Sequence, residues 1–308
     1  MNTLRRALRD YVTMRRALGY KFVEPEHRLG RFVTFMEQHN AVVITTKLAI
    51  EWATQSPGRH ASWAIHLTDV RGFARHLHSL DPRTEVPPTG IIPYRGRTQP
   101  YLYTDEEIQT LLAAALTLPP VHGLRRWTYH CLFGLLAVTG MRISEALALR
   151  RQDVDLKRGV LTIHDTKFGK SRLVPVHLSA RQALLEYTRQ RDAHIDPPRS
   201  EYFLVAERGG RLLPQYVYRV FWCLSRQIGL RGPSDHVGPR LHDFRHRFAV
   251  ATLLDWYRSG QSVDNLMPIL STYLGHSCVR DTYWYLSACP ELMEHAARRL
   301  ETHREASP

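Results

Sequence analysis

The stretch GVLTIHDTKFGKSRLVPVHL (residues 159–178) contains two runs of β-favouring residues on either side of Lys-Phe-Gly-Lys. Short runs rich in Val, Ile, Leu and Thr that flank a Gly-containing turn are typical of a β-hairpin. Residues 202–206 are a second, shorter candidate strand, and few others are visible. The sequence therefore predicts one small sheet in a chain that is otherwise helical.

Outside this hairpin, apolar residues recur at the three- and four-residue spacing of amphipathic helices. In residues 3–18 arginines fill the positions between the apolar residues, and Gly19 is a candidate helix C-cap. Thr104 and Glu107 match a capping box, so a helix is expected to begin there. The other predicted helices span residues 26–39, 46–55, 60–80, 122–138, 178–192, 214–228, 241–257, 264–274 and 290–303.

A proline-rich segment separates the first helices from the rest of the chain. Residues 81–100, DPRTEVPPTGIIPYRGRTQP, contain five prolines and two glycines, which exclude a continuous helix and favour an extended linker. We therefore expect a helical domain over residues 1–90, a linker over residues 91–103 and a second domain over residues 104–308. The predicted fold class is mainly α with a small β-sheet (α+β).

The charge of the chain favours a polyanionic partner. Its 308 residues include 42 Lys and Arg against 29 Asp and Glu, for a formal net charge of +13, and 44% of the residues are hydrophobic. Only five of the 42 cations are Lys, and the planar guanidinium of Arg pairs bidentately with phosphate. The positive excess is shared by residues 1–100 and 101–308. These features predict a folded protein that binds nucleic acid, although a basic composition alone also serves solubility.

The sequence also suggests a compartment. The four cysteines lack metal-site spacing, so neither a zinc ribbon nor a disulfide framework is expected. The opening MNTLRRALRDYV has no apolar signal-peptide run, and the longest apolar stretch, near residues 131–141, is too short to span a bilayer. We therefore expect a cytoplasmic protein without a membrane partner.

Four stretches of the second domain concentrate groups that bind phosphate or transfer protons. In the first, Arg142 follows a helix-terminating Thr-Gly, so its guanidinium and the free N–H groups of the next helix can face one anion. Glu145, three residues later, is placed to orient that guanidinium, although an ordinary surface ion pair is the alternative. The four stretches are TGMRISEAL (139–147), TKFGKSRLVP (166–175), LHDFRHRFA (241–249) and LGHSCVRDTYWYL (274–286).

The third stretch places an imidazole beside a guanidinium. His242 and Arg245 are three residues apart on one helix face, where both can meet the same phosphate. His242 and His246 also have the i, i+4 spacing of zinc peptidase helices, but position 243 is Asp where that motif requires Glu. One or both histidines can instead be hydrogen-bonded packing residues, and this is the role expected for His246. We therefore expect no metal site here.

Together these groups are sufficient to cleave a phosphodiester without a metal. A nucleophile can form a covalent phosphoryl-enzyme while arginines stabilise the developing charge and an acid protonates the leaving oxygen. The sequence has no Walker glycine loop and no evident carboxylate cluster for two-metal chemistry. A polymerase, a helicase and a metal-dependent nuclease are therefore disfavoured.

In this order, the four stretches resemble the tyrosine recombinase (phage integrase) family. Its signature is an Arg, a Lys in a β-hairpin, His-x-x-Arg, a His or Trp, and a Tyr. The resemblance covers essentially the whole chain and implies a simple two-domain recombinase, with a helical core-binding domain and a catalytic domain that close as a clamp around duplex DNA. The amino-acid sequence of residues 271–293 is similar to that of transposon-associated integrases. The matching positions are Arg142, Lys167, His242, Arg245, His276 and Tyr285.

The resemblance implies a role for each matching residue. Tyr285 would attack the scissile phosphate to give a 3′-phosphotyrosine and a free 5′-hydroxyl, without metal, cofactor or ATP. Arg142 and Arg245 would bind the non-bridging oxygens, and Lys167 would protonate the leaving oxygen. The two histidines would position the phosphate or assist proton transfer. Tyr283 and Tyr273 are alternative hydroxyls, and Lys170 replaces Lys167 if the hairpin register shifts.

The resemblance also implies partners. The expected substrate is double-stranded DNA, bound by a homotetramer on two paired sites through a Holliday junction. The helix over residues 290–303 would dock on a neighbouring protomer or pack in cis, and the need for companion recombinases stays open. Two rival functions are a non-cutting DNA-binding regulator on the same scaffold and a type IB topoisomerase-like relaxing enzyme. The expected DNA contacts are Arg5, Arg6, Arg9, Arg15, Arg16, Arg95, Arg97, Lys170 and Arg172.

Overall fold

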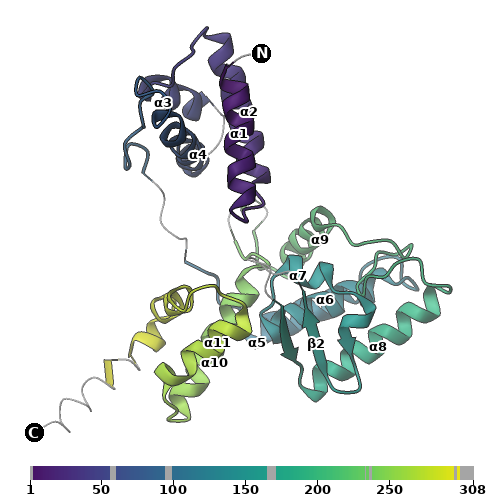
Figure 1. The fold of residues 1–308 in the computed structure, drawn as a ribbon. Helices are drawn as coiled ribbons and strands as arrows, with labels where there is room; N and C mark the ends of the chain where they lie inside the picture. Colours follow the sequence, from purple (N-terminus) through teal and green to yellow (C-terminus); the bar gives the residue numbers. More distant parts are fainter. Residues whose placement is uncertain are drawn as a thin grey trace, which may run out of the picture. The chain divides into compact units, whose positions relative to one another are not determined.

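The computed structural model describes residues 3–55, 60–93, 99–164, 171–232, 234–235, 238–294 and 297–298. Most of them are helical, and they contain one three-stranded sheet (Figure 1). The prediction of a mainly α fold with a small β-sheet is confirmed. The elements are α1 (Thr3–Ala17), α2 (Val23–Gln38), α3 (Thr46–Gln55), α4 (His60–His78), α5 (Asp105–Ala115), α6 (Arg125–Thr139), α7 (Ile143–Ala148), η1 (Arg151–Asp153), β1 (Val154–Asp155), β2 (Val160–Ile163), β3 (Arg172–Pro175), α8 (Leu178–His194), α9 (Pro214–Gln227), α10 (Asp243–Arg258), α11 (Val263–Leu274), α12 (Arg280–Tyr283) and η2 (Trp284–Ala288).

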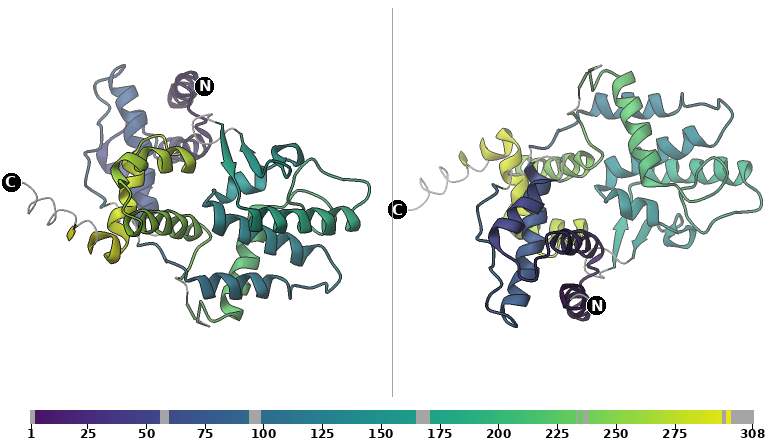
Figure 2. Two further views of the ribbon diagram at one scale, coloured as in Figure 1. Left: turned by 90° about the horizontal axis from the view of Figure 1, so that it is seen from below. Right: turned by 90° about the horizontal axis from the view of Figure 1, so that it is seen from above.

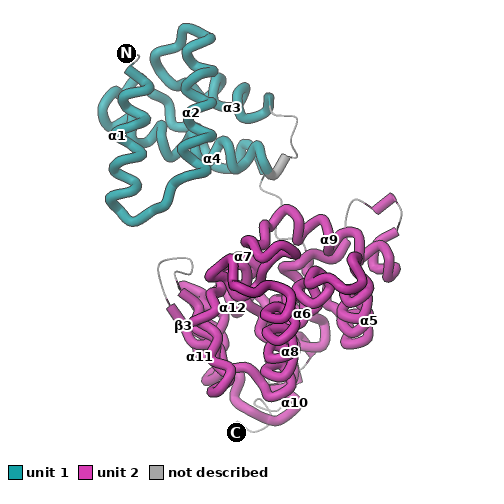
Figure 3. Tube along the Cα trace, turned by 90° about the vertical axis from the view of Figure 1, so that its right-hand side faces the viewer, with its two compact units in different colours: residues 1–98 teal, residues 99–308 magenta. Residues whose placement is uncertain are grey.

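The chain divides into two compact units, residues 1–98 and 99–308 (Figure 3). In the first unit, α1 and α2 lie side by side, and α4 packs against α1, α2 and α3 (Figure 1). The apolar stripe of α1 predicted from its spacing is buried in a core that includes Phe32, Met36 and Phe73. Burial of one face of each helix stabilises this unit, because isolated helices of this length are marginal in water.

The second unit is built around α6. Helices α5, α8 and α10 all pack against it, and Figure 2 shows α6 and α8 side by side. Apolar side chains on nearly every side of α6, such as Leu132, Phe133 and Leu136, are buried, as expected for a central helix. The helix ends at Gly140, whose φ of 58° is left-handed, so the chain can turn sharply toward α7.

The three strands form an antiparallel sheet in the order β1-β2-β3. The predicted hairpin is present, with Val160 opposite Pro175 and Ile163 opposite Arg172. The third strand, β1, is only two residues long and was too short to give a pattern in the sequence. The prediction of a strand over residues 202–206 is wrong, because residues 202 and 205 make only isolated bridges, to Arg150 and Arg211.

The last helices form a separate part of the core of the second unit. Side chains of α10, α11 and η2 pack together, including Leu253, Met267 and Tyr285. The helix expected over residues 290–303 is seen at residues 290–294 and 297–298, and its remainder lies outside the described residues. None of the described helices is both long and apolar enough to cross a membrane.

Candidate active site

Three arginines converge on the C-terminal end of α11. The carbonyl of Tyr273 accepts a hydrogen bond from Arg172 Nε at 2.6 Å, and the carbonyl of Leu274 accepts one from Arg245 Nη2 at 2.6 Å. Arg142 Nη2 donates to the carbonyl of Gly275 at 3.1 Å. The last carbonyls of a helix have no partner within the helix and carry partial negative charge, so they attract cations. The end of α11 therefore acts as a template that holds the guanidiniums together.

Gly275 allows this arrangement. It caps α11 with a φ of 67°, in the left-handed region that favours glycine. A Cβ atom here would lie 2.8 Å from Arg172 Nη1, closer than real Cβ contacts. The Leu-Gly-His sequence noted at residues 274–276 thus serves two purposes, since the turn after the helix exposes its carbonyls and leaves space for Arg172.

Glu145 lies beside two of the three arginines. Its Oε1 accepts from Arg142 Nη1 at 2.8 Å, and its Oε2 accepts from Arg172 Nη2 at 2.8 Å. Burial by itself raises the pKa of this carboxyl, but the hydrogen bonds and charge of Arg172, together with bonds from Arg142, outweigh burial and lower the pKa. Glu145 is therefore a buried carboxylate, and the ion pair predicted with Arg142 belongs to this cluster.

Arg245 is the most buried of the arginines. Only 2% of it is exposed, and Nη1 donates to the carbonyl of Gly140 at 3.0 Å. Burial lowers its pKa to about 10, although the neighbouring Tyr285, which shares a hydrogen bond with it, raises the pKa. A guanidinium with a pKa of about 10 is still protonated at pH 7. Arg245 thus joins the ends of α6 and α11 through two backbone carbonyls.

The two predicted histidines lie at the same cluster. His242 precedes α10 and is exposed on one side, while the surrounding protein and the charge of Arg245 lower its pKa. His276 follows Gly275, and its Nδ1 lies 2.7 Å from Thr282 Oγ1. Burial, Arg245 and Arg142 lower the pKa of His276 to about 4. At pH 7 His276 is therefore neutral and offers one N–H and one lone pair.

Tyr285 lies against this set of side chains. It is 3% exposed, its ring is 6.1 Å from the His276 ring at an interplanar angle of 20°, and its hydroxyl hydrogen-bonds to Arg245. The alternative hydroxyls differ. Tyr283 is 44% exposed, and Tyr273 stacks on Phe248. The hydroxyl of Tyr285 is therefore the one joined to Arg245, a guanidinium predicted to bind the scissile phosphate.

Five of the six predicted catalytic residues thus lie together. The sixth, Lys167, and its alternative Lys170 lie outside the described residues, between β2 and β3. The sequence did not reveal the backbone acceptors at Gly140, Leu274 and Gly275, or Thr282 beside His276. The glycines that terminate α6 and α11 were a signal for the former, because a helix that ends in a left-handed glycine exposes its last carbonyls.

The family profile of the phage integrases, described as Phage integrase family, matches residues 102–291. The chain belongs to the phage integrase family. One relative, the integrase/recombinase y4rB of Sinorhizobium fredii (strain NBRC 101917 / NGR234), is 50% identical over 312 residues and covers 99% of each chain. Tyrosine recombinase XerD of Caulobacter vibrioides is 30% identical over 239 residues, which are 76% of this chain and 73% of XerD.

The fold of this phage integrase family protein is also found among solved structures. The Tn1549 transposon integrase, in complex with transposon right end DNA, aligns with a TM-score of 0.67 and covers 98% of this chain and 99% of its own. The two sequences are 15% identical, so this likeness concerns the fold alone.

The predicted DNA contacts on α1 of this integrase family protein are partly engaged within the first unit. Arg5 pairs with Glu37 at 2.5 Å and Arg16 with Glu26 at 2.5 Å, while the guanidinium of Arg15 lies 4.1 Å from the centre of the Tyr20 ring. Arg6 and Arg9 are exposed. Arg95 and Arg97 lie outside the described residues. Contact of these side chains with DNA stays a prediction.

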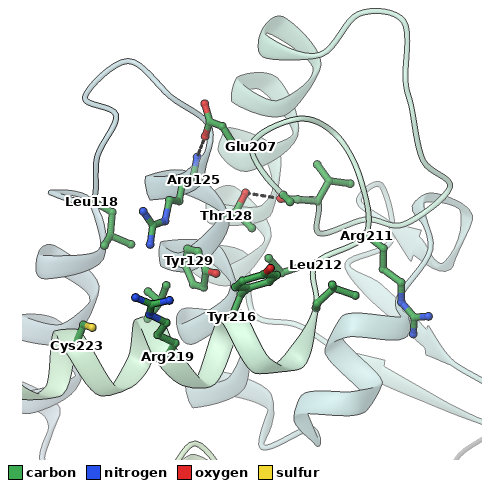
Figure 4. A pocket seen from close by; sticks show the side chains of 14 residues that line it. Leu118, Arg125, Thr128, Tyr129, Glu207, Arg211, Leu212, Tyr216, Arg219 and Cys223 are labelled. Atoms are coloured by element: carbon green, nitrogen blue, oxygen red, sulfur yellow. Dashed lines mark hydrogen bonds between the residues drawn. The ribbon is translucent and has the colours of Figure 1, made fainter.

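A separate cavity of about 560 Å³ lies between α6 and α9 in the integrase family domain (Figure 4). Figure 4 shows Arg125 and Arg219 projecting from these two helices beside Tyr129 and Tyr216. None of the five predicted catalytic residues that the structure describes lines this cavity. It is therefore distinct from the arginine cluster at the end of α11.

His246 is expected to make the stability of this integrase family protein depend on pH. The residue is 8% exposed, its ring is 5.4 Å from the Tyr285 ring, and its Nδ1 has no hydrogen-bond partner among the described residues. Burial, with the nearby His242, lowers its pKa to about 4. An unfolded His has a pKa near 6.5, so between pH 6.5 and pH 4 the unfolded chain binds more protons. The free energy of unfolding therefore falls as the pH is lowered through that window.

Urea denaturation at pH 7, 6 and 5 checks this prediction. His246→Gln is expected to remove up to about 1.4 kcal/mol per pH unit from the slope of unfolding free energy against pH. The exposed His122 serves as the matched control, and His122→Gln is expected to keep the wild-type slope. Equal slopes in wild type and His246→Gln would contradict the prediction.

Proposed function

We propose that the protein is a site-specific DNA recombinase that cuts and rejoins DNA through a 3′-phosphotyrosyl intermediate on Tyr285. The observation that carries this proposal is the contact of the Tyr285 hydroxyl with Arg245, inside a cluster that also holds Arg142 and His276. A nucleophile beside fixed guanidiniums has the parts that phosphoryl transfer requires.

In this mechanism the Tyr285 oxygen forms a bond to phosphorus while the bond to the 5′ oxygen breaks. Arg142 and Arg245 bind the non-bridging oxygens, where negative charge develops, and their backbone partners preorganise them for it. The leaving 5′ oxygen takes its proton from Lys167, or from Lys170 if the hairpin register is shifted. His276 and His242 accept the phenolic proton or orient the phosphate.

Because the phosphodiester energy is kept in the phosphotyrosine, attack by a second 5′-hydroxyl reverses the step and rejoins DNA. Neither ATP nor a metal takes part in this scheme. It requires two cleavable sites brought together, so we propose a homotetramer on paired sites of double-stranded DNA, for integration or transposition of a mobile element.

The two units fit a division of labour. We propose that residues 1–90 bind the core DNA site, that residues 91–103 link the units and that residues 104–308 carry the chemistry, with the C-terminal segment in contact with a neighbouring protomer or packed in cis. The division of the described chain into two compact units, residues 1–98 and 99–308, supports this proposal. We propose that this work takes place in the cytoplasm, at the nucleoid if the source is a prokaryote.

Covalent trapping tests the proposal. Duplexes that bind the protein are first selected from a random pool and from DNA flanking its coding region. They are then given a nick near the centre, so that the short strand diffuses away after cleavage. We expect a denaturation-resistant adduct that forms in EDTA and maps to Tyr285 by peptide mass. Tight binding without an adduct would instead favour a non-cutting regulator, and sequence-independent relaxation of supercoils would favour a topoisomerase.

The affinity for DNA is expected to depend steeply on salt. With a net charge of +13 and arginines in place of most lysines, binding releases many counterions from the phosphate backbone. We expect the dissociation constant for a selected duplex to rise at least about tenfold between 50 and 200 mM NaCl in a fluorescence anisotropy titration. An unchanged constant would argue against an extensive phosphate interface.

A further inference from the structure

We propose that Arg172 is a positioning residue, which holds Glu145 in place and through Glu145 orients Arg142, and that it does not contact DNA. This inference rests on the proposed recombinase function. It replaces the phosphate-backbone contact that the sequence predicted for Arg172.

The bonds of Arg172 are directed inward. Its side chain is 9% exposed, and that of its partner Glu145 is 6% exposed. Nε donates to the carbonyl of Tyr273 at 2.6 Å, while Nη1 and Nη2 donate to the two oxygens of Glu145 at 3.1 and 2.8 Å. Each of the three guanidinium nitrogens of Arg172 thus donates a hydrogen bond, and its charge is neutralised by the carboxylate of Glu145. Arg245 is at least as buried, but the carbonyls of Gly140 and Leu274 that it bonds are neutral, so its charge remains available to a phosphate.

Glu145 divides its bonds evenly between two arginines. Arg142 reaches Oε1 through Nη1 at 2.8 Å and Oε2 through its backbone N–H at 2.9 Å. Arg172 reaches the same two oxygens, so it supplies the other half of the bonds that fix the carboxylate. Loss of Arg172 would remove two of the four hydrogen bonds that fix the Glu145 carboxylate. The direction of the Arg142 guanidinium would then rest on a less firmly held Glu145 and on the Gly275 carbonyl.

Arg172 also links three elements. It begins β3, it bonds to Glu145 on α7, and it bonds to the end of α11. Lys170, a candidate general acid, is two residues earlier in the sequence. Arg172 thus connects the strand that follows the hairpin turn to the side chain that fixes Arg142. Position 172 requires Arg for these bonds, because the single ammonium of Lys cannot reach both oxygens of Glu145 and the carbonyl of Tyr273 at once.

The charges around Glu145 make the role of Arg172 measurable as a change in the pKa of Glu145. Arg142 on the N-terminal side of α7 and Arg172 on β3 face Glu145 directly, and Arg245 on α10 interacts with it at longer range. Arg150, Asp153 and His164 line the same cavity as Glu145. Burial raises the pKa of Glu145, and the bonds and charge of Arg172 oppose it. Without Arg172, Glu145 would take up a proton at a higher pH and release its hold on Arg142.

The test compares Arg172→Met, Arg172→Lys and Glu145→Gln/Arg172→Met with wild type. The matched control is Arg189→Met, because Arg189 lies on α8 with its side chain 74% exposed. For each variant, DNA affinity and its salt dependence are measured by anisotropy on a selected duplex, and the single-turnover rate of adduct formation is measured from pH 5.5 to 8. Urea denaturation over the same pH range reports on Glu145 without requiring cleavage.

We expect Arg172→Met to bind DNA within about twofold of wild type with an unchanged salt slope, and to form adduct at least tenfold more slowly at pH 7. Its deficit should grow as the pH falls, and the added Glu145→Gln change should remove that pH dependence. Arg172→Lys keeps the positive charge and replaces Arg172→Met in the test if that variant does not fold. Its rate of adduct formation should also be low, but the deficit should not grow as the pH falls. Arg189→Met should match wild type throughout.

Two results would overturn the inference. One is weaker DNA binding by Arg172→Met with a salt slope lower by about one, as a lost phosphate contact would give. The other is the same pH dependence of the unfolding free energy in Arg172→Met and in Glu145→Gln/Arg172→Met, which would mean that Arg172 does not control the protonation of Glu145. A wild-type protein that forms no adduct would contradict the proposed function instead, and the unfolding and binding measurements would still decide the role of Arg172.

Discussion

Replacement of Tyr285 by Phe is expected to lower the rate of covalent DNA capture by at least roughly 10⁴-fold, as is typical when a covalent nucleophile is removed. The change removes one oxygen and keeps the ring, which is 3% exposed and stacks against His276. The fold and the DNA-binding surfaces are therefore expected to persist. The measurement is the yield of denaturation-resistant adduct on nicked duplex, together with the dissociation constant for the same duplex.

Two neighbouring tyrosines provide matched controls. Tyr283 is two residues away and 44% exposed, and Tyr273 lies on α11 and stacks on Phe248. Tyr283→Phe and Tyr273→Phe should each form adduct within about threefold of wild type, because neither ring is placed by a contact with Arg245. Formation of adduct by Tyr285→Phe at the wild-type rate would contradict the assignment of Tyr285 as the nucleophile. If that adduct mapped to Tyr283, Tyr283 would be the nucleophile instead.

The local sequence predicted most of the elements because their signals are local. The apolar spacing in residues 3–18 corresponds to α1 at Thr3–Ala17, and the Thr104 capping box begins α5 as expected. The hairpin at residues 159–178 corresponds to β2 and β3. The two-residue strand β1 and the short η2 helix gave no signal, because a segment of two to five residues is too short to show a period.

The candidate site could be predicted only as a set of residue types in order. The sequence placed Arg142 and Glu145 together because they are three residues apart, and the structure joins them at 2.8 Å. It could not place Arg172 in the same cluster, since the partner is 27 residues away and a tertiary ion pair has no local pattern. The Leu274 carbonyl that receives Arg245 is likewise 29 residues away, and backbone acceptors are the same for every sequence.

The structure also shows the surroundings of His246, where the sequence predicted no metal site. Its i, i+4 spacing from His242 is compatible with metal binding, but the two rings are nearly perpendicular at a centroid distance of 4.8 Å, and His246 packs on Trp284 and Tyr285. Over the described ranges, no three His, Cys, Asp or Glu side chains gather in a group suited to a metal ion. The structure therefore places His246 in the packing of the Tyr285 segment.

Substitution of Arg245 by Lys is expected to be the most damaging change that keeps the charge. Arg245 is 2% exposed, and its two terminal nitrogens reach carbonyls on different elements, Gly140 at 3.0 Å and Leu274 at 2.6 Å. A single ammonium cannot span both, so one carbonyl loses its partner and the buried charge is poorly compensated. We expect a loss of about 1 to 3 kcal/mol in the free energy of unfolding, the range typical when a buried hydrogen-bonding group is left without its partner.

The same substitution should lower the rate of adduct formation by at least about 100-fold, since one preorganised donor to the developing charge is worth that much in other phosphoryl and acyl transfers. Arg247, two residues later on α10, is the matched control, because its single ion pair with Asp105 is one that Lys can also form. Arg247→Lys should keep both the stability and the rate. Urea denaturation and single-turnover trapping measure the two effects separately. An Arg245→Lys protein as stable as wild type would show that the two carbonyls do not depend on the guanidinium fork, and a wild-type rate would remove Arg245 from the proposed mechanism.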